Sequence, residues 1–262
     1  MMKLKKDPNI LWTKKLILMI NNNINKKSPF PKKIPELTSK QKLIKDDFME
    51  YWLKVLRKNY RIIDKFNHQT IVNNKPMNFQ KTLEIGAGIG EHLNYEKLDD
   101  NQKKNYYVMD IRENLLEILS KEHPMVNAIL GDCEKEFNFE NNFFGRIIAI
   151  HVLEHLPNLP NTISEVARVL KNDGMFQVVI PCEGSLAYTL ARKISAERIF
   201  KKKYKSSYDW FIKSEHVNLP YEIFNELEKK FVITKKTYFP IPISFEFCNL
   251  CIGINLKLKP KN

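Results

Sequence analysis

The chain has few cysteines, few glycines and no long hydrophobic run. Four cysteines in 262 residues argue against a disulfide framework and favour a reducing, cytoplasmic setting. No apolar stretch reaches the roughly 18 residues that a membrane-spanning helix needs. The basic start of the chain is interrupted by Lys14 and Lys15, and no small-residue cleavage site follows. We therefore do not expect a signal peptide.

Two of the cysteines, Cys248 and Cys251, form a C-x-x-C pair. They lie in the run FEFCNLCIGINL, which is typical of a strand, and no second pair is near them. Alternation along a strand would point them to opposite faces of a sheet. We expect neither a zinc site nor a redox role for this pair.

Three of the eight glycines fall at alternate positions in the segment TLEIGAGIGEH, residues 82–92. Thr82, Leu83 and Ile85 are typical of the end of a buried parallel strand. Glycines just after it let the backbone turn and approach a nucleotide-like ligand. The spacing is not that of the dinucleotide fingerprint, whose third glycine would fall at Glu91. The pattern is instead acid-x-G-x-G-x-G, beginning at Glu84.

This pattern resembles motif I of the class I S-adenosylmethionine-dependent methyltransferases, and further segments follow the family in order. The resemblance implies that Glu84 and the glycine loop hold the methionine end of the cofactor, and that Asp110, which ends the strand YYVMD, binds the ribose hydroxyls. AILGDC (128–133) resembles the segment whose acid faces the adenine amino group. The cofactor residues implied are Glu84, Gly86, Ala87, Gly88, Gly90, Asp110, Ile111, Asp132, Cys133 and His151.

The same resemblance continues through residues 143–158, which contain His-Val-Leu-Glu-His, and through 165–181, which predict a helix, a turn at 172–174 and a strand. Taken alone, Asp110 would be a helix N-cap and the glycine loop a turn. Five segments in one order favour the family interpretation.

The sequence predicts an α/β fold: a Rossmann-like, doubly wound, seven-stranded sheet, mostly parallel, with its last strand antiparallel. Strands are expected near 82–85, 106–110, 127–130, 146–151, 174–180, 231–239 and 245–258. Residues 1–78 are expected to form a basic arm and a helical cap over the cofactor cleft, with a helix at about 39–59. Residues 79–262 would form the methyltransferase domain, with a substrate-binding insertion at 182–220.

Histidines are the candidate general bases, because imidazole titrates near neutral pH. His151 is preferred to His155, and His216 and His68 remain alternatives. A metal on His151 and His155 would need more ligands than the sequence shows, so no metal is expected. The acceptor is expected to be a small molecule, a glycan or a lipid-linked compound methylated at oxygen. The residues predicted to bind it are His216, Tyr208, Trp210 and Arg192.

The net charge of +13 is unevenly spread. Residues 84–184 hold nine basic against seventeen acidic residues, whereas residues 1–45 hold twelve against two. A basic flank can attract an anionic membrane surface or nucleic acid, or it can reflect a lysine-rich genome composition. The Asn/Asp-Pro-Pro-aromatic tetrapeptide of base-amine methyltransferases is absent, so no specific nucleic acid is expected. We expect a cytoplasmic enzyme, with peripheral contact at the inner membrane surface as an addition. A basic binding module with an idle cofactor fold is the alternative.

Overall fold

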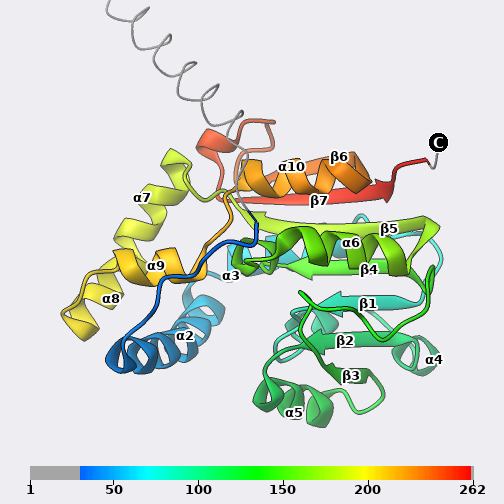
Figure 1. The fold of residues 1–262 in the computed structure, drawn as a ribbon, viewed down its shortest axis with the longest axis horizontal. Helices are drawn as coiled ribbons and strands as arrows, with labels where there is room; N and C mark the ends of the chain where they lie inside the picture. The colour runs from blue at the N-terminus through cyan, green and yellow to red at the C-terminus, as the bar shows by residue number, and fades with distance from the viewer. Residues whose placement is uncertain (1–29, 261–262) are drawn as a thin grey trace, which may run out of the picture.

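The structure is a computed structural model that describes residues 30–260. Its centre is one seven-stranded sheet with the strand order β3-β2-β1-β4-β5-β7-β6 (Figure 1). The strands are β1 Thr82–Ile85, β2 Tyr106–Asp110, β3 Asn127–Leu130, β4 Phe144–Ile150, β5 Leu170–Pro181, β6 Phe231–Phe239 and β7 Cys251–Leu258.

Strands β1 to β5 pair in parallel, and β7 pairs antiparallel with both β5 and β6. This confirms the predicted sheet. β1 lies at the centre, with Leu83 opposite Tyr107 of β2 and Ile147 of β4. All four residues of β1 are buried, as expected of a strand covered on both faces. The order reverses at β1, so a crevice for a ligand is expected beyond its carboxyl end.

Helices and short 3-10 turns connect the strands and cover both faces of the sheet. The elements are α2 Ser39–Asn59, α3 Arg61–Val72, η1 Glu91–Asn94, α4 Asp100–Lys103, α5 Glu113–Glu122, η2 Leu153–His155, α6 Leu159–Val169, α7 Leu186–Ile194, α8 Ala196–Tyr204, α9 Asp209–Glu215, α10 Pro220–Lys230 and η3 Glu246–Cys248. The helix expected at about 39–59 is confirmed as α2.

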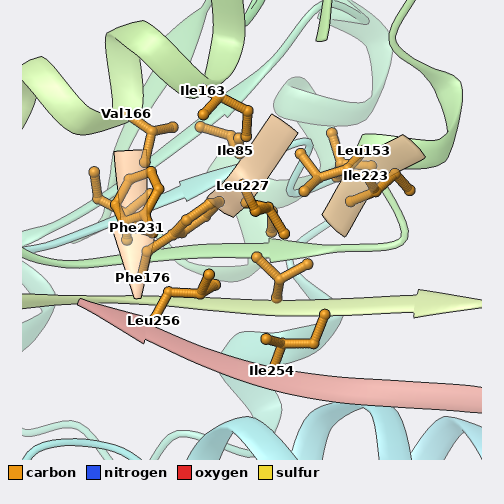
Figure 2. Close-up of a cluster of buried hydrophobic side chains, with 14 of the residues drawn as sticks. Ile85, Leu153, Ile163, Val166, Phe176, Ile223, Leu227, Phe231, Ile254 and Leu256 are labelled. Carbon is orange, nitrogen blue, oxygen red and sulfur yellow. The ribbon is translucent and has the colours of Figure 1, made fainter. Parts of the chain in front are cut away.

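One core lies between the sheet and the pair α6 and α10. Figure 2 shows Ile163 and Val166 of α6 close to Phe176 of β5 and to Leu227 of α10. A second core lies on the other face, where Ile71 of α3 joins residues of α5 and the strands. Helix α3, which belongs to the predicted N-terminal region 1–78, therefore shares a core with the sheet.

A third core builds the insertion. Phe48 of α2 packs against Phe200 of α8 and Phe211 of α9, with ring centroids 5.0 and 5.1 Å away. In Figure 1, α7, α8, α9 and α2 group at the end of the sheet toward which the carboxyl ends of β1 and β4 point. The insertion and α2 thus form one helical unit beside the expected ligand crevice.

Two sequence predictions were wrong in detail. The last strand was predicted from residue 245 but begins at Cys251, because Glu246–Cys248 form a 3-10 turn. Cys248 therefore does not share a strand with Cys251, and both thiols are free. The predicted turn at 172–174 lies within β5, where the pairing with β4 shifts register between Leu170 and Met175.

Within residues 30–260, no helix is long and apolar enough to cross a membrane.

Candidate functional site

The glycine loop follows β1 and turns back over the end of β2. Gly86, Gly88 and Gly90 all have positive φ angles, of 65°, 57° and 83°. The amides of Gly86 and Ala87 donate to the Met109 carbonyl at 2.7 and 3.2 Å. A Cβ on Gly86 would lie 2.4 Å from a methyl group of Val152, whereas a Cβ on Gly88 would meet only the Arg112 guanidinium, at 4.0 Å. Packing against Val152 therefore leaves no room for a side chain at position 86, whereas the described residues leave room for one at position 88.

Asp110 ends β2 beside this loop. Its carboxylate accepts from the Gly88 amide at 2.8 Å and from the Arg112 guanidinium at 3.0 and 3.2 Å. Burial alone would raise the pKa of Asp110, but the hydrogen bonds and charge of Arg112 and the Gly88 amide outweigh it and lower the pKa. The side chain is thus held as a carboxylate. Arg112 is half exposed, and ribose binding by Asp110 stays a prediction.

Glu84 is buried on the face of β1 that packs against α3 and α5. Its carboxyl group accepts from the Tyr106 hydroxyl at 2.8 Å. Burial, aided by the charge of Glu96, raises the pKa of Glu84 to about 8. The structure places Glu84 beneath the loop, within a buried polar cluster that includes Glu96 and Arg146. Its role as a cofactor ligand stays a prediction.

Other residues predicted to bind the cofactor follow β2 and β3. The Gly131 amide donates to the Asp110 carbonyl at 3.0 Å, which ties the two strand ends together. Asp132 accepts from the Glu134 amide at 2.9 Å, and Ile111 is exposed. Burial raises the pKa of the Cys133 thiol to about 12, so this cysteine stays protonated. The acids at positions 110 and 132 therefore lie on neighbouring strand ends.

His151 leaves β4 at the same edge of the sheet. Its φ of 54° is left-handed, a conformation that a residue other than glycine seldom adopts. Its amide is held by the Val179 carbonyl at 2.9 Å. Its Nδ1 lies 3.0 Å from Oε1 of Glu154, and 31% of the side chain is exposed. A buried carboxylate therefore orients an accessible imidazole.

Glu154 is the centre of a group of three histidines. Burial would raise its pKa, but the hydrogen bond with His151 and the charges of His151, His155 and His216 lower it to about 2. His155 Nε2 lies 4.0 Å from Glu154 Oε1, and the rings of His155 and His216 are 5.2 Å apart. The structure thus brings together His151, His155 and His216, which the sequence had named separately.

The remaining residues of the predicted acceptor site make contacts within the protein. Arg192 donates to Glu183 at 2.6 Å and lies over the Tyr208 ring. Tyr208 is buried in the helical unit of α2 and the insertion. Trp210 donates to the Ser206 hydroxyl at 3.1 Å. These contacts give all three a structural role, and acceptor binding by them stays a prediction.

His68 lies elsewhere, in α3. It is buried, its Nδ1 is 3.3 Å from that of His92, and its ring stacks on Tyr95. Its nearest partners therefore differ from those of His151.

Two residues of the site were missed from the sequence. Arg112, two positions after Asp110, could have been found from that spacing, since a cation so close to a strand-end acid can pair with it. Glu183 accepts from His216 at 2.8 Å. No sequence pattern indicated Glu183, because 33 residues separate it from His216 in the chain.

Comparison with known proteins agrees with this geometry. Residues 83–178 match the family described as "Methyltransferase domain". Among solved structures, the chain is similar to an S-adenosylmethionine-dependent methyltransferase from Thermotoga maritima, with a TM-score of 0.59, 17% identity, and coverage of 82% of this chain and 97% of that one. A TehB-like methyltransferase from Corynebacterium glutamicum gives a TM-score of 0.55 and 12% identity, and covers 82% and 98%.

A curated human protein, arginine-hydroxylase NDUFAF5 of mitochondria, is 29% identical over 104 residues. The match covers 38% of this chain and spans only 28% of that relative's length.

The domain match and the fold together define the class. Residues 83–178 form a methyltransferase domain on a Rossmann-like sheet, which indicates an S-adenosylmethionine-dependent methyltransferase with S-adenosylmethionine as its cofactor. The Asp110 carboxylate, which ends β2 beside the glycine loop, offers oxygens of the kind that accept from ribose hydroxyls. When bound, the cofactor supplies an electrophilic methyl group on a positively charged sulfur.

Proposed function

We propose that the enzyme transfers the methyl group to a hydroxyl oxygen of a small-molecule, glycan or lipid-linked acceptor, with His151 as the general base. The observation that carries the proposal is the pairing of His151 Nδ1 with the buried Glu154 carboxylate at 3.0 Å. Glu154 can only accept when ionised, so Nδ1 carries the proton and Nε2 keeps a lone pair. A neutral imidazole oriented in this way is suited to take a hydroxyl proton.

The proposed reaction needs little else from the protein. Nε2 of His151 would take the proton of the acceptor hydroxyl as its oxygen bonds to the methyl carbon. The cofactor would supply that methyl group, and its sulfur would leave with the electron pair of the carbon–sulfur bond. Holding oxygen, carbon and sulfur in line can supply about 7–11 kcal/mol of the acceleration. The helical unit of α2 and the insertion stands beside the strand ends, where it can hold the acceptor.

The test uses the whole protein, methyl-labelled S-adenosylmethionine and a panel of nucleoside-diphosphate sugars and polyprenyl-phosphate sugars. We expect His151→Gln to lower kcat by roughly 10²–10⁴-fold, because the base is lost. The dissociation constant for S-adenosylmethionine, measured by calorimetry, should change by less than about tenfold. Proton NMR of the product should show a methyl ether.

His123→Gln is the matched control, since His123 is the C-cap of α5, whereas the Glu154 cluster is built from η2 and the residue after α9. An undiminished kcat in His151→Gln would exclude the base role. A methyl group found on nitrogen would exclude the oxygen acceptor.

We also propose that the enzyme contacts an anionic membrane surface through an apolar ridge, defined as the exposed side chains of Leu186, Leu190 and Ile194 on α7 together with Ile243, Phe245 and Phe247 before β7. The three α7 residues are four apart and share one helix face. Lysines and arginine lie beside them in the chain, at Lys193, Arg198 and Lys201–Lys203. Apolar side chains flanked by cations suit the surface of an anionic bilayer.

Vesicle sedimentation tests this contact. The protein should bind vesicles containing phosphatidylserine more strongly than pure phosphatidylcholine vesicles, and rising salt should weaken the binding. Ile194→Asp combined with Phe245→Asp should reduce it at least tenfold. Ile62→Asp is the control, because Ile62 on α3 has the same 73% exposure as Ile194. Equal sedimentation of the two variants would exclude the ridge.

A further inference from the structure

We propose that Glu154, His155 and His216 bind one divalent transition-metal ion. One ligand atom from each residue lies within 4.8 Å of the other two. The sequence had offered only His151 and His155 as a pair. The structure replaces His151 with His216, which follows α9 in the insertion, and adds a carboxylate from η2. The cluster therefore has three protein ligands drawn from two separate segments of the chain.

The two imidazoles are held in the tautomer that a metal requires. His155 Nδ1 lies 2.7 Å from the Glu215 carbonyl oxygen, which can only accept. His216 Nδ1 lies 2.8 Å from Oε2 of Glu183, whose other oxygen accepts from Arg192. Each Nδ1 is therefore the protonated nitrogen, and each Nε2 keeps a lone pair. Histidine ligands of metals are commonly oriented in this way by a carboxylate or a backbone carbonyl.

The carboxylate supplies a second, independent observation. Only 1% of the Glu154 residue is exposed, and its Oε2 has no hydrogen-bond partner among the described residues 30–260. Oε1 already contacts His151 at 3.0 Å. A buried carboxylate oxygen without a partner is costly, and a cation beside it removes that cost. The orphaned oxygen belongs to the side chain whose other oxygen, Oε1, lies 3.0 Å from His151 Nδ1 and 4.0 Å from His155 Nε2.

The ligand set indicates which ions fit. Two imidazole nitrogens and one carboxylate suit Zn²⁺, Co²⁺ or Fe²⁺ rather than Mg²⁺ or Ca²⁺, which prefer oxygen ligands. Metal–ligand bonds of about 2.0–2.2 Å would need the ligand atoms to close to roughly 3.3 Å. Side-chain rotation can achieve this, since a third of the His155 side chain is exposed. Three protein ligands also leave a coordination position open, as in catalytic rather than structural zinc sites.

The position of the cluster suggests what the ion does. Glu154 and His155 directly follow His151, whereas His216 belongs to the insertion. A metal here would fasten the insertion to the carboxyl edge of the sheet. Its open position would bind the acceptor oxygen and make the hydroxyl more acidic. The role in binding the acceptor hydroxyl rests on the proposed methyl transfer to oxygen. Binding of the ion itself is independent of that proposal.

Cobalt binding tests the site without an activity assay. The full-length protein is stripped with a chelator and titrated with Co²⁺, which absorbs in the visible range when bound by few ligands. We expect one equivalent to bind and Zn²⁺ to displace it. His155→Ala and His216→Ala should each raise the dissociation constant for Co²⁺ at least tenfold. His123→Ala should leave it unchanged, and calorimetry with S-adenosylmethionine should show that every variant still binds the cofactor.

Three results would overturn the metal site: no stoichiometric Co²⁺ binding, equal affinity in the wild type and in the His155 and His216 variants, or an intense thiolate–cobalt band that places the ion on a cysteine. Methyl transfer to oxygen that continues after complete chelation would remove the role in acceptor binding and leave the proposed function intact. Failure of the proposed function would instead appear as full activity in His151→Gln.

Discussion

Gly86 is the position where backbone and packing constrain the site most tightly. Its φ of 65° is left-handed, and an added Cβ would lie 2.4 Å from Val152. A non-glycine residue in this conformation costs about 1–2 kcal/mol, and overpacking adds about 1–3 kcal/mol. We expect Gly86→Ala to lower the free energy of unfolding by roughly 2–4 kcal/mol, as measured by urea denaturation.

Gly88→Ala is the matched control, because Gly88 has a similar φ of 57° and open space around it. It should cost only the backbone term of about 1–2 kcal/mol. Its Cβ would instead enter the space beside Asp110, so the affinity for S-adenosylmethionine should fall. Equal stability of the two variants would contradict the role assigned to Val152.

At the scale of elements, the packing of α2 on α8 and α9, within the helical unit of α2 and the insertion, depends on the buried ring of Phe48. Phe48 is fully buried and has four aromatic neighbours from α8, α9 and the segment between them, with centroids 5.0–6.3 Å away. We expect Phe48→Ala to cost about 3–5 kcal/mol locally. Amide hydrogen exchange should accelerate in α8 and α9 and stay slow in β1 and β4. Leu43→Ala, at an exposed position of α2, should leave exchange unchanged, and faster exchange throughout the sheet would show that this unit does not unfold separately.

The elements also show where sequence reasoning succeeds. β1 to β4 were located because buried parallel strands are short apolar runs that end in recognisable loops. The segment 245–250 was wrongly assigned to a strand, although it alternates. The side chain of Asn249 accepts from the Ile241 amide and donates to the Phe245 carbonyl, both at 2.8 Å. A buried side chain thus takes the backbone groups that a strand would have paired, and alternation cannot reveal this.

For the molecule as a whole, the sequence located the strand-end residues but not their partners. Glu84, Asp110 and Asp132 were found because each follows or ends an apolar run. The pairing of His216 with Glu183, and the packing of Phe48 on the insertion, join segments far apart in the chain. Such contacts depend on how the helices fold back over the sheet, and no local spacing encodes that.

The pH dependence of stability follows from a group buried at the centre of the sheet. Burial raises the pKa of Glu84 from 4.5 to about 8. Between these values the folded protein holds a proton at this site that the unfolded chain has released. The free energy of unfolding therefore decreases as the pH rises through this window. Glu84→Gln cannot ionise, so it should remove this loss while keeping an acceptor for the Tyr106 hydroxyl.

Between pH 5 and pH 8, the free energy of unfolding of Glu84→Gln should rise by roughly 1–3 kcal/mol relative to that of the wild type. The full linkage effect would be about 1.4 kcal/mol per pH unit, and relaxation around the buried site reduces it. Urea denaturation at both pH values measures the change. Glu117→Gln, at an exposed position of α5, is the control. If the Glu84→Gln and wild-type profiles run parallel, then Glu84 ionises in the folded protein as readily as in the unfolded chain. In that case its charge is stabilised at the glycine loop, and the variant should bind S-adenosylmethionine more weakly.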